Sequence, residues 1–361
     1  MGKTHIVTPS PEWQDCIKSI IDNPGLVMVI GASDTGKTTF CAQLLNAAVE
    51  VGVKCALVDA DMGQSEVGPP GTIGLGEPVA PVELPGDIPV RRMYFAGTTS
   101  PVGNMLPSVV GTRKMVDEAK AHGAALIVVD TTGLIRGVLA RKLKIHKVDL
   151  LAPSHIVVMQ RGHEMNPLIA AFSKLENTRI HEPAVSESAR PKSPEFRAAR
   201  RRQKLARHFE RAEEHTIRLD DVSCWGSWLN SGRLMPWQRV RLMEQILRTR
   251  VLHAEGTGQG FYIVVDRAPE SPNVAALEER IGTKEITIVP GNAFTYAYVG
   301  LADARGRLLD VGIIHAIDFR QRHISLITRL KTVAPVRIIQ FGLMKVKPDG
   351  TELPKLRPGE L

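Results

Sequence analysis

The residues with the clearest chemical meaning lie between Gly31 and Thr38, where Gly31, Gly36, Lys37 and Thr38 fit the pattern G-x-x-x-x-G-K-[ST]. The pattern follows an apolar run and precedes a helical one, which is the context of a phosphate-binding loop. Backbone N–H groups of such a loop surround phosphate oxygens, and the helix N-terminus adds partial positive charge. We expect Lys37 to contact the β- and γ-phosphates and Thr38 to bind Mg²⁺. The sequence therefore predicts a nucleoside triphosphate site formed by Gly31, Ala32, Ser33, Asp34, Thr35, Gly36, Lys37, Thr38 and Thr39.

Two further apolar runs end in acidic residues. One ends with Asp59 and Asp61, and the other runs through Asp130 into a polar turn. Alternate residues of a strand face the same side, so Asp59 and Asp61 are expected to point together. Asp130 closes its strand as a Walker B acid does, and we expect it to bind Mg²⁺ with Thr38. A kinase needs one carboxylate near the metal and one near the attacking hydroxyl; the alternative for each aspartate is a cap or a turn.

Composition limits the class of protein. The chain has 361 residues, of which 43% are hydrophobic and 23% charged, as expected for a globular protein of two or three domains. It has no apolar run of the roughly 18 residues that a membrane span needs and no secretory signal, which predicts a cytoplasmic protein with no membrane partner. Its four cysteines form no C-x-x-C pair, so neither a zinc site nor a disulfide framework is expected.

Positive charge is concentrated in one segment. The formal net charge is +8, and the segment from Arg190 to Arg211 holds nine Lys or Arg residues against two Glu. Such a segment is either the solvated face of a helix or a movable element that meets phosphates. Its arginine content favours the second interpretation, because the guanidinium fork matches phosphate geometry. Arg161, at the end of a later apolar run, is a candidate contact to adenine or phosphate.

The order of expected elements indicates an α/β fold. Strands and helices alternate up to about residue 160, which predicts a mostly parallel sheet with its ligand at the carboxyl ends of the strands. A Gly/Pro-rich loop is expected at 65–78 and a helix from about Thr112 to His122. From about Val222 short β-rich runs dominate and predict a smaller, largely antiparallel domain. Trp225, Trp228 and Trp237 either pack in the core or at a domain interface, or stack on bases. We expect an N-terminal segment (1–24), a P-loop domain (25–215) with a lid at about 186–211, and a β-rich domain (216–361).

These motifs together resemble the polynucleotide 5'-hydroxyl kinases, a family that includes the kinase-like subunit of the eukaryotic mRNA cleavage and polyadenylation machinery. The family loop G-x-x-D-x-G-K-[ST] is matched with its aspartate, Asp34. It is followed in order by D-x-G-Q, P-G-T, T-S-P-x-x-N, a T-x-G turn and an arginine-rich lid. The matching residues are Asp61, Gly63, Gln64, Pro70, Gly71, Thr72, Thr99, Ser100, Pro101, Asn104, Thr131, Gly133, Arg190, Arg197, Arg200 and Arg201.

The resemblance implies transfer of the ATP γ-phosphoryl group to a 5'-hydroxyl of RNA or DNA, with ATP and Mg²⁺ as cofactors. It assigns catalytic roles to Lys37, to Asp61 as the base, and to the lid residues Arg197, Arg200 and Arg201. The expected substrate contacts are Gln64, Thr99, Asn104, Thr131, Gly133 and Arg190. Leu134 stands where eukaryotic members have a tryptophan thought to grip the terminal base, and leucine offers no π-face.

Two alternative functions remain open from the sequence. One is an ATPase or GTPase switch of the same fold, although no N-K-x-D motif for guanine is present. The other is a subunit that holds ATP without catalysis. In the kinase interpretation only the backbone of Asp34 faces the β-phosphate, and its carboxylate is expected to project toward the acceptor or a lid arginine.

Overall fold

The computed structural model describes residues 10–186, 189–357 and 359–361. The chain forms two compact units, Met1–Arg201 and Arg202–Leu361. Their boundary lies inside helix α6 (Pro194–Phe209), upstream of the 215/216 boundary expected from the sequence. Most of the arginine-rich segment lies in this helix, and the helix from Arg202 onward belongs to the second unit, where the Phe209 ring lies 6.4 Å from the Tyr298 ring.

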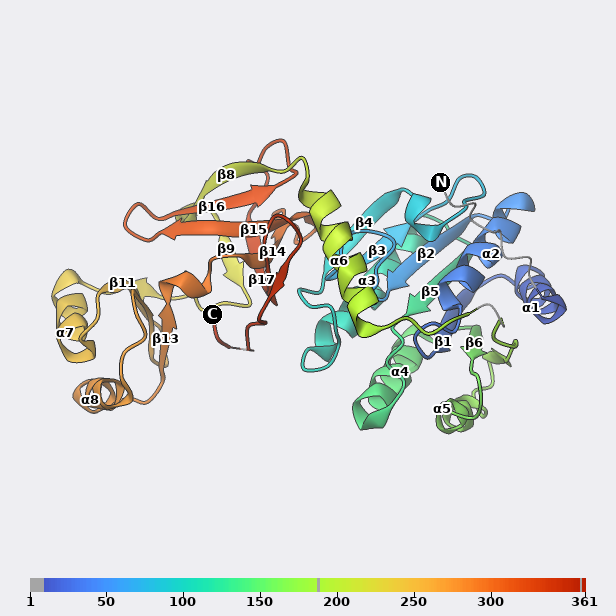
Figure 1. The fold of residues 1–361 in the computed structure, drawn as a ribbon, viewed down its shortest axis with the longest axis horizontal. Helices are drawn as coiled ribbons and strands as arrows, with labels where there is room; N and C mark the ends of the chain where they lie inside the picture. The colour runs from blue at the N-terminus through green and yellow to red at the C-terminus, as the bar shows by residue number, and fades with distance from the viewer. Residues whose placement is uncertain (1–9, 187–188, 358) are drawn as a thin grey trace. The chain divides into compact units, whose positions relative to one another are not determined.

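The first unit is built around a seven-stranded sheet in the order β4-β3-β2-β5-β1-β6-β7 (Figure 1). Each pair of neighbours among β2, β5, β1, β6 and β7 is parallel, whereas β3 pairs antiparallel with β2 and β4. The strands are β1 (Leu26–Gly31), β2 (Cys55–Ala60), β3 (Thr72–Gly76), β4 (Val90–Phe95), β5 (Leu126–Thr131), β6 (His155–Met159) and β7 (Arg179–His181). The predicted mostly parallel α/β sheet is confirmed.

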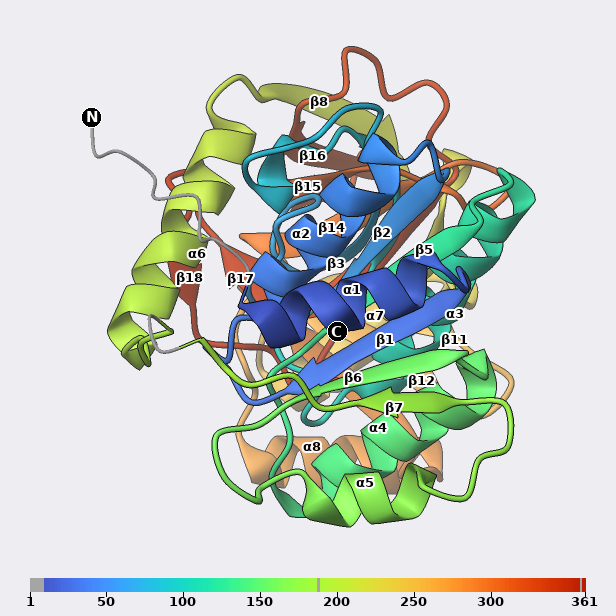
Figure 2. The same cartoon turned by 90° about the vertical axis from the view of Figure 1, so that its right-hand side faces the viewer.

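Helices cover both faces of this sheet (Figure 2). On one face α1 (Pro11–Ile21) and α2 (Lys37–Glu50) pack on the strands, and the Trp13 ring lies 5.3 Å from the Phe40 ring, edge to face. The other face is covered by α3 (Met105–Ala121), α4 (Gly137–Leu151) and α5 (Asn166–Phe172). Two apolar layers therefore enclose β1, β2 and β5, which explains why these three strands read as continuous apolar runs.

Two elements of the first unit differ from the expectation. The Gly/Pro-rich stretch around Gly74 was expected to be a loop, but it contains β3. A Cβ atom at Gly74 would meet the Val67 carbonyl oxygen at 1.9 Å, so only glycine allows this strand so close to the loop before it. Helix α3 begins at Met105, about two turns before the expected start near Thr112.

The second unit contains two sheets. The larger one has the order β18-β17-β14-β15-β16-β8, with β9 paired to β17, and the smaller one has the order β10-β11-β12-β13. Most pairs are antiparallel, as predicted; β12 with β13 and β9 with β17 are parallel. The strands are β8 (Glu213–Arg218), β9 (Ser223–Trp225), β10 (Arg233–Leu234), β11 (Val251–Gly256), β12 (Phe261–Val265), β13 (Ile286–Pro290), β14 (Ala297–Ala302), β15 (Leu308–Asp318), β16 (His323–Thr328), β17 (Ile338–Val346) and β18 (Glu352–Leu353).

Two helices accompany the smaller sheet, although the sequence was expected to be almost entirely β-rich here. They are α7 (Trp237–Leu247) and α8 (Ser271–Ile281). Met243, Leu247 and Leu277 form an apolar cluster with Ile263 and Val265 of β12. Among the residues that the structure describes, no helix combines the length and apolar character needed to cross a membrane.

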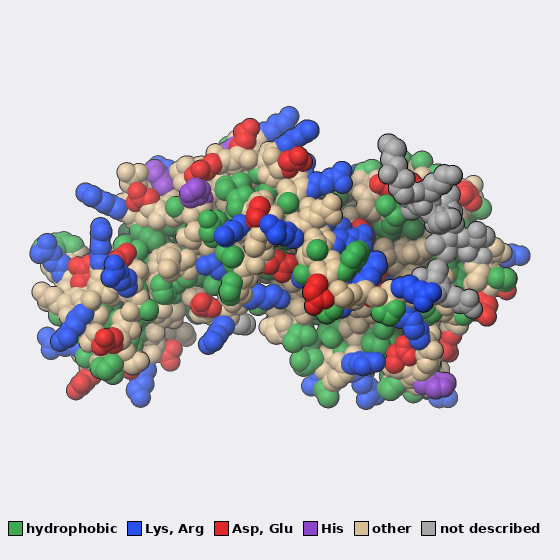
Figure 3. Space-filling view, in the orientation of Figure 1, with side chains coloured by type: hydrophobic (Ala, Val, Ile, Leu, Met, Phe, Trp, Pro, Cys, Tyr) green, Lys and Arg blue, Asp and Glu red, His purple; other side chains and the backbone are tan. Residues whose placement is uncertain are grey.

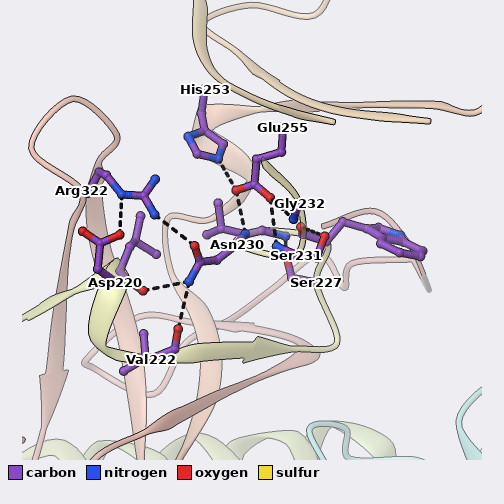
Figure 4. A network of polar contacts seen from close by, with 12 residues as sticks. Asp220, Val222, Ser227, Asn230, Ser231, Gly232, His253, Glu255 and Arg322 are labelled. Atoms are coloured by element: carbon purple, nitrogen blue, oxygen red, sulfur yellow. Dashed lines mark hydrogen bonds and ion pairs between the residues drawn. The ribbon is translucent and has the colours of Figure 1, made fainter. Parts of the chain in front are cut away.

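One buried carboxylate organises a turn of the second unit (Figure 4). Glu255 of β11 is 1% exposed, and its oxygens accept hydrogen bonds from the backbone N–H groups of Asn230, Ser231 and Gly232 at 2.7 to 2.9 Å. The ring of His253 contacts the same carboxylate. Burial raises the pKa of Glu255, but the hydrogen bonds from His253 and the turn leave it below the usual range. The group is therefore held as a carboxylate at neutral pH.

We expect Glu255→Gln to destabilise the second unit by about 2 kcal/mol or more, because an amide cannot accept three N–H bonds and leaves buried donors unpaired. Urea unfolding followed by tryptophan fluorescence measures this change. Glu279→Gln, at an exposed position of α8, is the control and is expected to change stability by less than about 0.5 kcal/mol. Equal stability of the two variants would contradict the role given to Glu255.

Candidate active site

The phosphate-binding loop has the backbone that its sequence predicts. Gly31 ends β1 beside β6, and a Cβ there would lie 2.4 Å from the Met159 carbonyl oxygen. Gly36, with φ of 91°, precedes α2, and Asp34, with φ of 60°, is also left-handed. The Lys37 ammonium is buried and donates to the Ala32 carbonyl at 2.6 Å. This bond uses one of the three N–H donors of the ammonium.

Thr38 and Asp130 are in direct contact. The Thr38 hydroxyl donates to Oδ2 of Asp130 at 2.6 Å, and Oδ1 of Asp130 is buried with no partner among the described residues. Burial raises the pKa of Asp130 to about 6, against the lowering effects of Lys37 and Thr38. A hydroxyl beside an unpartnered carboxylate oxygen is a hard donor set of the kind that Mg²⁺ prefers. The described residues contain no group of three or more acidic, His or Cys side chains placed for a metal.

Asp59 and Asp61 have different environments, although the sequence predicted that they point together. Asp59 is buried at the end of β2, and its carboxylate accepts the backbone N–H groups of Asp61, Glu66 and Val67. Burial and the charge of Asp130 raise the pKa of Asp59, and the N–H donors of Val67 and Glu66 oppose this rise. Asp59 therefore holds the loop that follows β2.

Asp61 lies just beyond β2 and is only partly buried. Its Oδ1 accepts the backbone N–H groups of Gly63 at 3.1 Å and Gln64 at 3.2 Å. Its Oδ2 accepts no hydrogen bond from any residue that the structure describes. The carboxylate is thus fixed in orientation through one oxygen while the other remains available as a base.

Glycines let the motif segments pack directly on one another. A Cβ at Gly63 would lie 2.6 Å from the Thr99 carbonyl, and one at Gly133 would lie 2.5 Å from the Ser33 nitrogen. The Gly71 carbonyl accepts N–H groups of Ala96 and Gly97, both at 2.9 Å. The D-x-G-Q turn therefore adjoins the T-S-P segment, and the T-x-G turn adjoins the phosphate-binding loop.

The carboxylate of Asp34 projects to the lid and not into the phosphate cradle. Its Oδ2 accepts the Lys192 backbone N–H at 2.9 Å and pairs with the Arg197 guanidinium at 3.1 Å. Gln64 donates to the Arg197 carbonyl at 3.4 Å. The start of α6 is thus tied to both the phosphate-binding loop and the turn that carries Asp61.

Two other arginines continue this set of contacts. Arg200 pairs with Glu66 at 2.8 Å, and Arg161 donates to the carbonyl oxygens of Asp34 at 2.6 Å and Ala189 at 2.9 Å. Arg201 is partly buried and Arg190 exposed. The lid segment expected at 186–211 includes residues 187–188, which lie outside the described part of the chain.

The structure gives Thr131 an interior role. It was predicted to contact substrate, but it is fully buried; its hydroxyl donates to the Val29 carbonyl and accepts from the Lys144 ammonium at 2.7 Å. Gln64, Thr99 and Asn104 are partly exposed, and their predicted substrate contacts stay predictions. Leu134 is also partly exposed.

Sequence reasoning missed two buried lysines of α4. Lys144 and Lys147 are each 1% exposed, and Lys144 also donates to the Thr132 carbonyl at 2.7 Å, so it supports the T-x-G turn. Burial lowers the pKa of Lys147 to about 7, against the opposite effect of the Asp61 charge. The only sequence signal that both lysines lie on one face of α4 was their i, i+3 spacing. This spacing did not indicate burial, because lysines on a helix usually face solvent.

We expect Asp34→Asn to speed hydrogen exchange of the Lys192 amide and its neighbours, since the variant loses the ion pair with Arg197 and weakens the bond from Lys192. Hydrogen–deuterium exchange of the ligand-free protein measures this effect without relying on activity. Asp149→Asn, at an exposed position of α4, is the control. If both variants exchanged as the wild type does, Asp34 would not hold the lid.

Lys147 is expected to make stability depend on pH. Its folded pKa of about 7 lies below its ordinary value of 10.5, so the unfolded chain binds more protons between these values and stability rises with pH there. Lys147→Met should abolish this contribution, which has a slope of up to about 1.4 kcal/mol per pH unit. Urea unfolding from about pH 7 to about pH 9 tests it, with exposed Lys142→Met as control. A constant difference between wild type and Lys147→Met would refute it.

Comparisons with known proteins agree on one family. The sequence model described as "mRNA cleavage and polyadenylation factor CLP1 P-loop" matches residues 31–211. The polyribonucleotide 5'-hydroxyl-kinase of Pyrococcus furiosus is 31% identical over 333 residues, which cover 92% of this chain and 91% of that protein. The polyribonucleotide 5'-hydroxyl-kinase of Methanocaldococcus jannaschii is 28% identical over 359 residues, with 98% and 96% coverage.

Among solved structures, Clp1p in its wild-type complex with Pcf11p matches with a TM-score of 0.60 at 12% identity, covering 92% of this chain and 77% of that one. At this identity the match concerns the fold, and the matched region extends across most of the chain. Three observations support the same family: the order of the motifs, the family-model match over half of the chain, and the relatives of nearly equal length. The chain belongs to the CLP1 P-loop family of polynucleotide kinases.

Proposed function

We propose that this protein is an ATP-dependent kinase that phosphorylates the 5'-hydroxyl end of RNA. The archaeal relatives that span the whole chain are named polyribonucleotide 5'-hydroxyl-kinases, which favours RNA as the acceptor. The observation that carries the proposal is the state of Asp61. One of its oxygens is fixed by two backbone N–H groups and the other is available, beside the strand that carries Asp130.

The proposed reaction is an in-line displacement at the γ-phosphorus of ATP. The 5'-oxygen of the strand forms the new bond to phosphorus, the bond to the β–γ bridging oxygen breaks, and ADP leaves with that electron pair. The 5'-hydroxyl proton passes to Oδ2 of Asp61, which acts as the general base. The two N–H groups on Oδ1 keep Oδ2 oriented toward the acceptor.

Thr38 and Asp130 would hold Mg²⁺, which neutralises charge on the β- and γ-phosphates when it is bound. The donor set fits this ion because it offers a hydroxyl and an unpartnered carboxylate oxygen. The pKa of Asp130, about 6, implies that protons compete with a cation at this carboxylate in mildly acidic solution.

Three cations would stabilise the transferring group, and all three bind protein oxygens in this structure. Lys37 binds the Ala32 carbonyl, Arg197 binds Asp34, and Arg200 binds Glu66. Phosphate oxygens carry more charge than the Ala32 carbonyl, so nucleotide binding favours an exchange of partners by Lys37. Arginines already gathered over the loop need small movements to reach the γ-phosphate and to exclude water.

Gln64, Thr99, Asn104, Gly133 and Arg190 remain the proposed contacts to the nucleic acid strand. Gln64 lies on the Asp61 turn, and Thr99 lies against Gly63 of the same turn. Gln64 and Thr99 therefore lie near the proposed base, which supports their role in holding the 5'-terminal nucleotide. A cytoplasmic location, expected from the sequence, remains part of the proposal.

We expect Asp61→Asn to lower kcat for strand labelling by at least about 100-fold, because the amide keeps the size of the side chain but accepts no proton. The assay uses γ-labelled ATP, Mg²⁺ and a 5'-hydroxyl oligoribonucleotide, and it measures label on the strand and label in free phosphate. Asp15→Asn, at an exposed position of α1, is the control and should retain wild-type activity.

Each rival function predicts a different result in this assay. An ATPase or GTPase switch would release labelled phosphate without labelling the strand. A subunit that only holds ATP would do neither. Labelling that persisted in Asp61→Asn would remove Asp61 from the mechanism.

A further inference from the structure

The second unit carries a stretch, residues 225–250, that combines exposed tryptophans with unpaired arginines; we call it the Trp–Arg segment. Trp225, Trp228 and Trp237 are 51%, 50% and 64% exposed. They are therefore not core residues, although core packing was one of the expectations from the sequence. Large exposed aromatic side chains are costly to leave in water and mark binding surfaces.

The arginines of this segment lack acidic partners among the described residues. It contains five arginines and one acidic residue, Glu244. All five are exposed: Arg233, Arg239, Arg241, Arg248 and Arg250. Within the described residues none of them forms an ion pair or a side-chain hydrogen bond, whereas Arg197 and Arg200 of the lid are both paired. Lys and Arg side chains are prominent on the face of the α7 and α8 region in Figure 3.

Helix α7 places an aromatic ring and a guanidinium together. The Arg241 guanidinium lies over the Trp237 ring, 5.3 Å from its centroid, and the two residues are one turn apart. Arg248 follows just past the end of the helix and is exposed. A stacked guanidinium is held in place while its N–H groups remain free for an anion.

The turn that carries Trp228 is rigid. Glu255 binds three consecutive N–H groups of residues 230–232, and the Ser231 N–H donates to the Trp228 carbonyl at 3.2 Å (Figure 4). The Asn230 amide adds bonds to the carbonyl oxygens of Leu219 and Val222. An exposed indole on a fixed turn loses little conformational entropy when a planar group stacks on it.

We propose that the Trp–Arg segment is a second nucleic-acid site, which binds single-stranded RNA by stacking bases on its indoles and pairing phosphates with its arginines. The site depends on the proposed function only for the choice of RNA. Stacking platforms interleaved with unpaired cations are what a single strand requires. An acidic protein would use the arginines but has less need of three exposed indoles.

Binding is measured without ATP, so that kinase activity has no part in the result. The probe is a 3'-labelled, 5'-phosphorylated oligouridylate of roughly 15 nucleotides, within the range of single-strand sites. Fluorescence anisotropy gives the Kd, and tryptophan emission reports stacking. A triple variant with Phe in place of Trp225, Trp228 and Trp237 is the control for quenching. It retains only the emission of Trp13, which is buried in the first unit, and RNA should not quench this emission. Inorganic polyphosphate serves as a polyanion without bases.

We expect Trp228→Ala or Trp237→Ala to raise the Kd for the oligouridylate by about 5- to 100-fold and to leave polyphosphate binding unchanged. Arg241→Gln should weaken both ligands and reduce the slope of log K against log salt by about 0.7. Trp237→Phe should recover most of the affinity. Arg329→Gln, an exposed arginine outside the segment, is the matched control and should change the Kd by less than about twofold. Circular dichroism confirms that each variant is folded.

Unchanged binding of the oligouridylate by folded tryptophan variants would overturn the proposal. If only Arg241→Gln lost affinity, and lost it for both ligands, the segment would be a surface for polyanions and not a site for single-stranded RNA. Absence of oligouridylate binding by the wild type would also overturn it. If the strand bound through this segment but was never phosphorylated, the kinase assignment would fail and the second site would stand.

Discussion

The parallel pairing of β1, β2 and β5 is the constraint on which the site depends. It brings the ends of three strands to one edge of the sheet, so that Gly31, Asp59 and Asp130 lie in neighbouring strands. The phosphate-binding loop leaves β1 at this edge, and Thr38 of its helix reaches Asp130 at the end of β5. Asp61 follows β2 at the same edge. The proposed metal ligand, the phosphate-binding loop and the proposed base thus have positions set by backbone pairing and not by flexible side chains.

Several charged side chains of the first unit have partners within the protein. Asp34 and Glu66 bind the lid arginines, and Asp59 binds the backbone of the loop that carries Asp61. Buried carboxylates and lysines are stable only with such partners. An incoming nucleotide offers stronger partners to Lys37 and Arg197. The placement of Asp34 also explains why a carboxylate is compatible with a phosphate-binding loop: its left-handed backbone directs the side chain to the lid.

Much of this arrangement could be predicted from local sequence. Apolar runs identified β1, β2 and β5, and glycine spacing identified the loop, because both depend on neighbours in the chain. Strand β3 was missed because Gly74 is required by a contact with Val67 that only the folded chain makes. Lys144 and Lys147 were missed because a helical lysine is usually exposed, and the burial of Thr131 was not foreseen because its hydroxyl binds one of these lysines. The lack of ion pairs at the described arginines of the Trp–Arg segment is likewise visible only in three dimensions.

The central claim is that Asp61 receives the proton of a strand's 5'-hydroxyl opposite a nucleotide held by the loop. The most direct test is a crystal structure of the protein with Mg²⁺, a non-hydrolysable ATP analogue and a 5'-hydroxyl oligoribonucleotide. The account predicts Oδ2 of Asp61 at about 2.6 to 3.2 Å from the terminal 5'-oxygen. It also predicts that Lys37 has left the Ala32 carbonyl for the phosphates. A 5'-oxygen held by another group, with Asp61 facing away from it, would contradict the account.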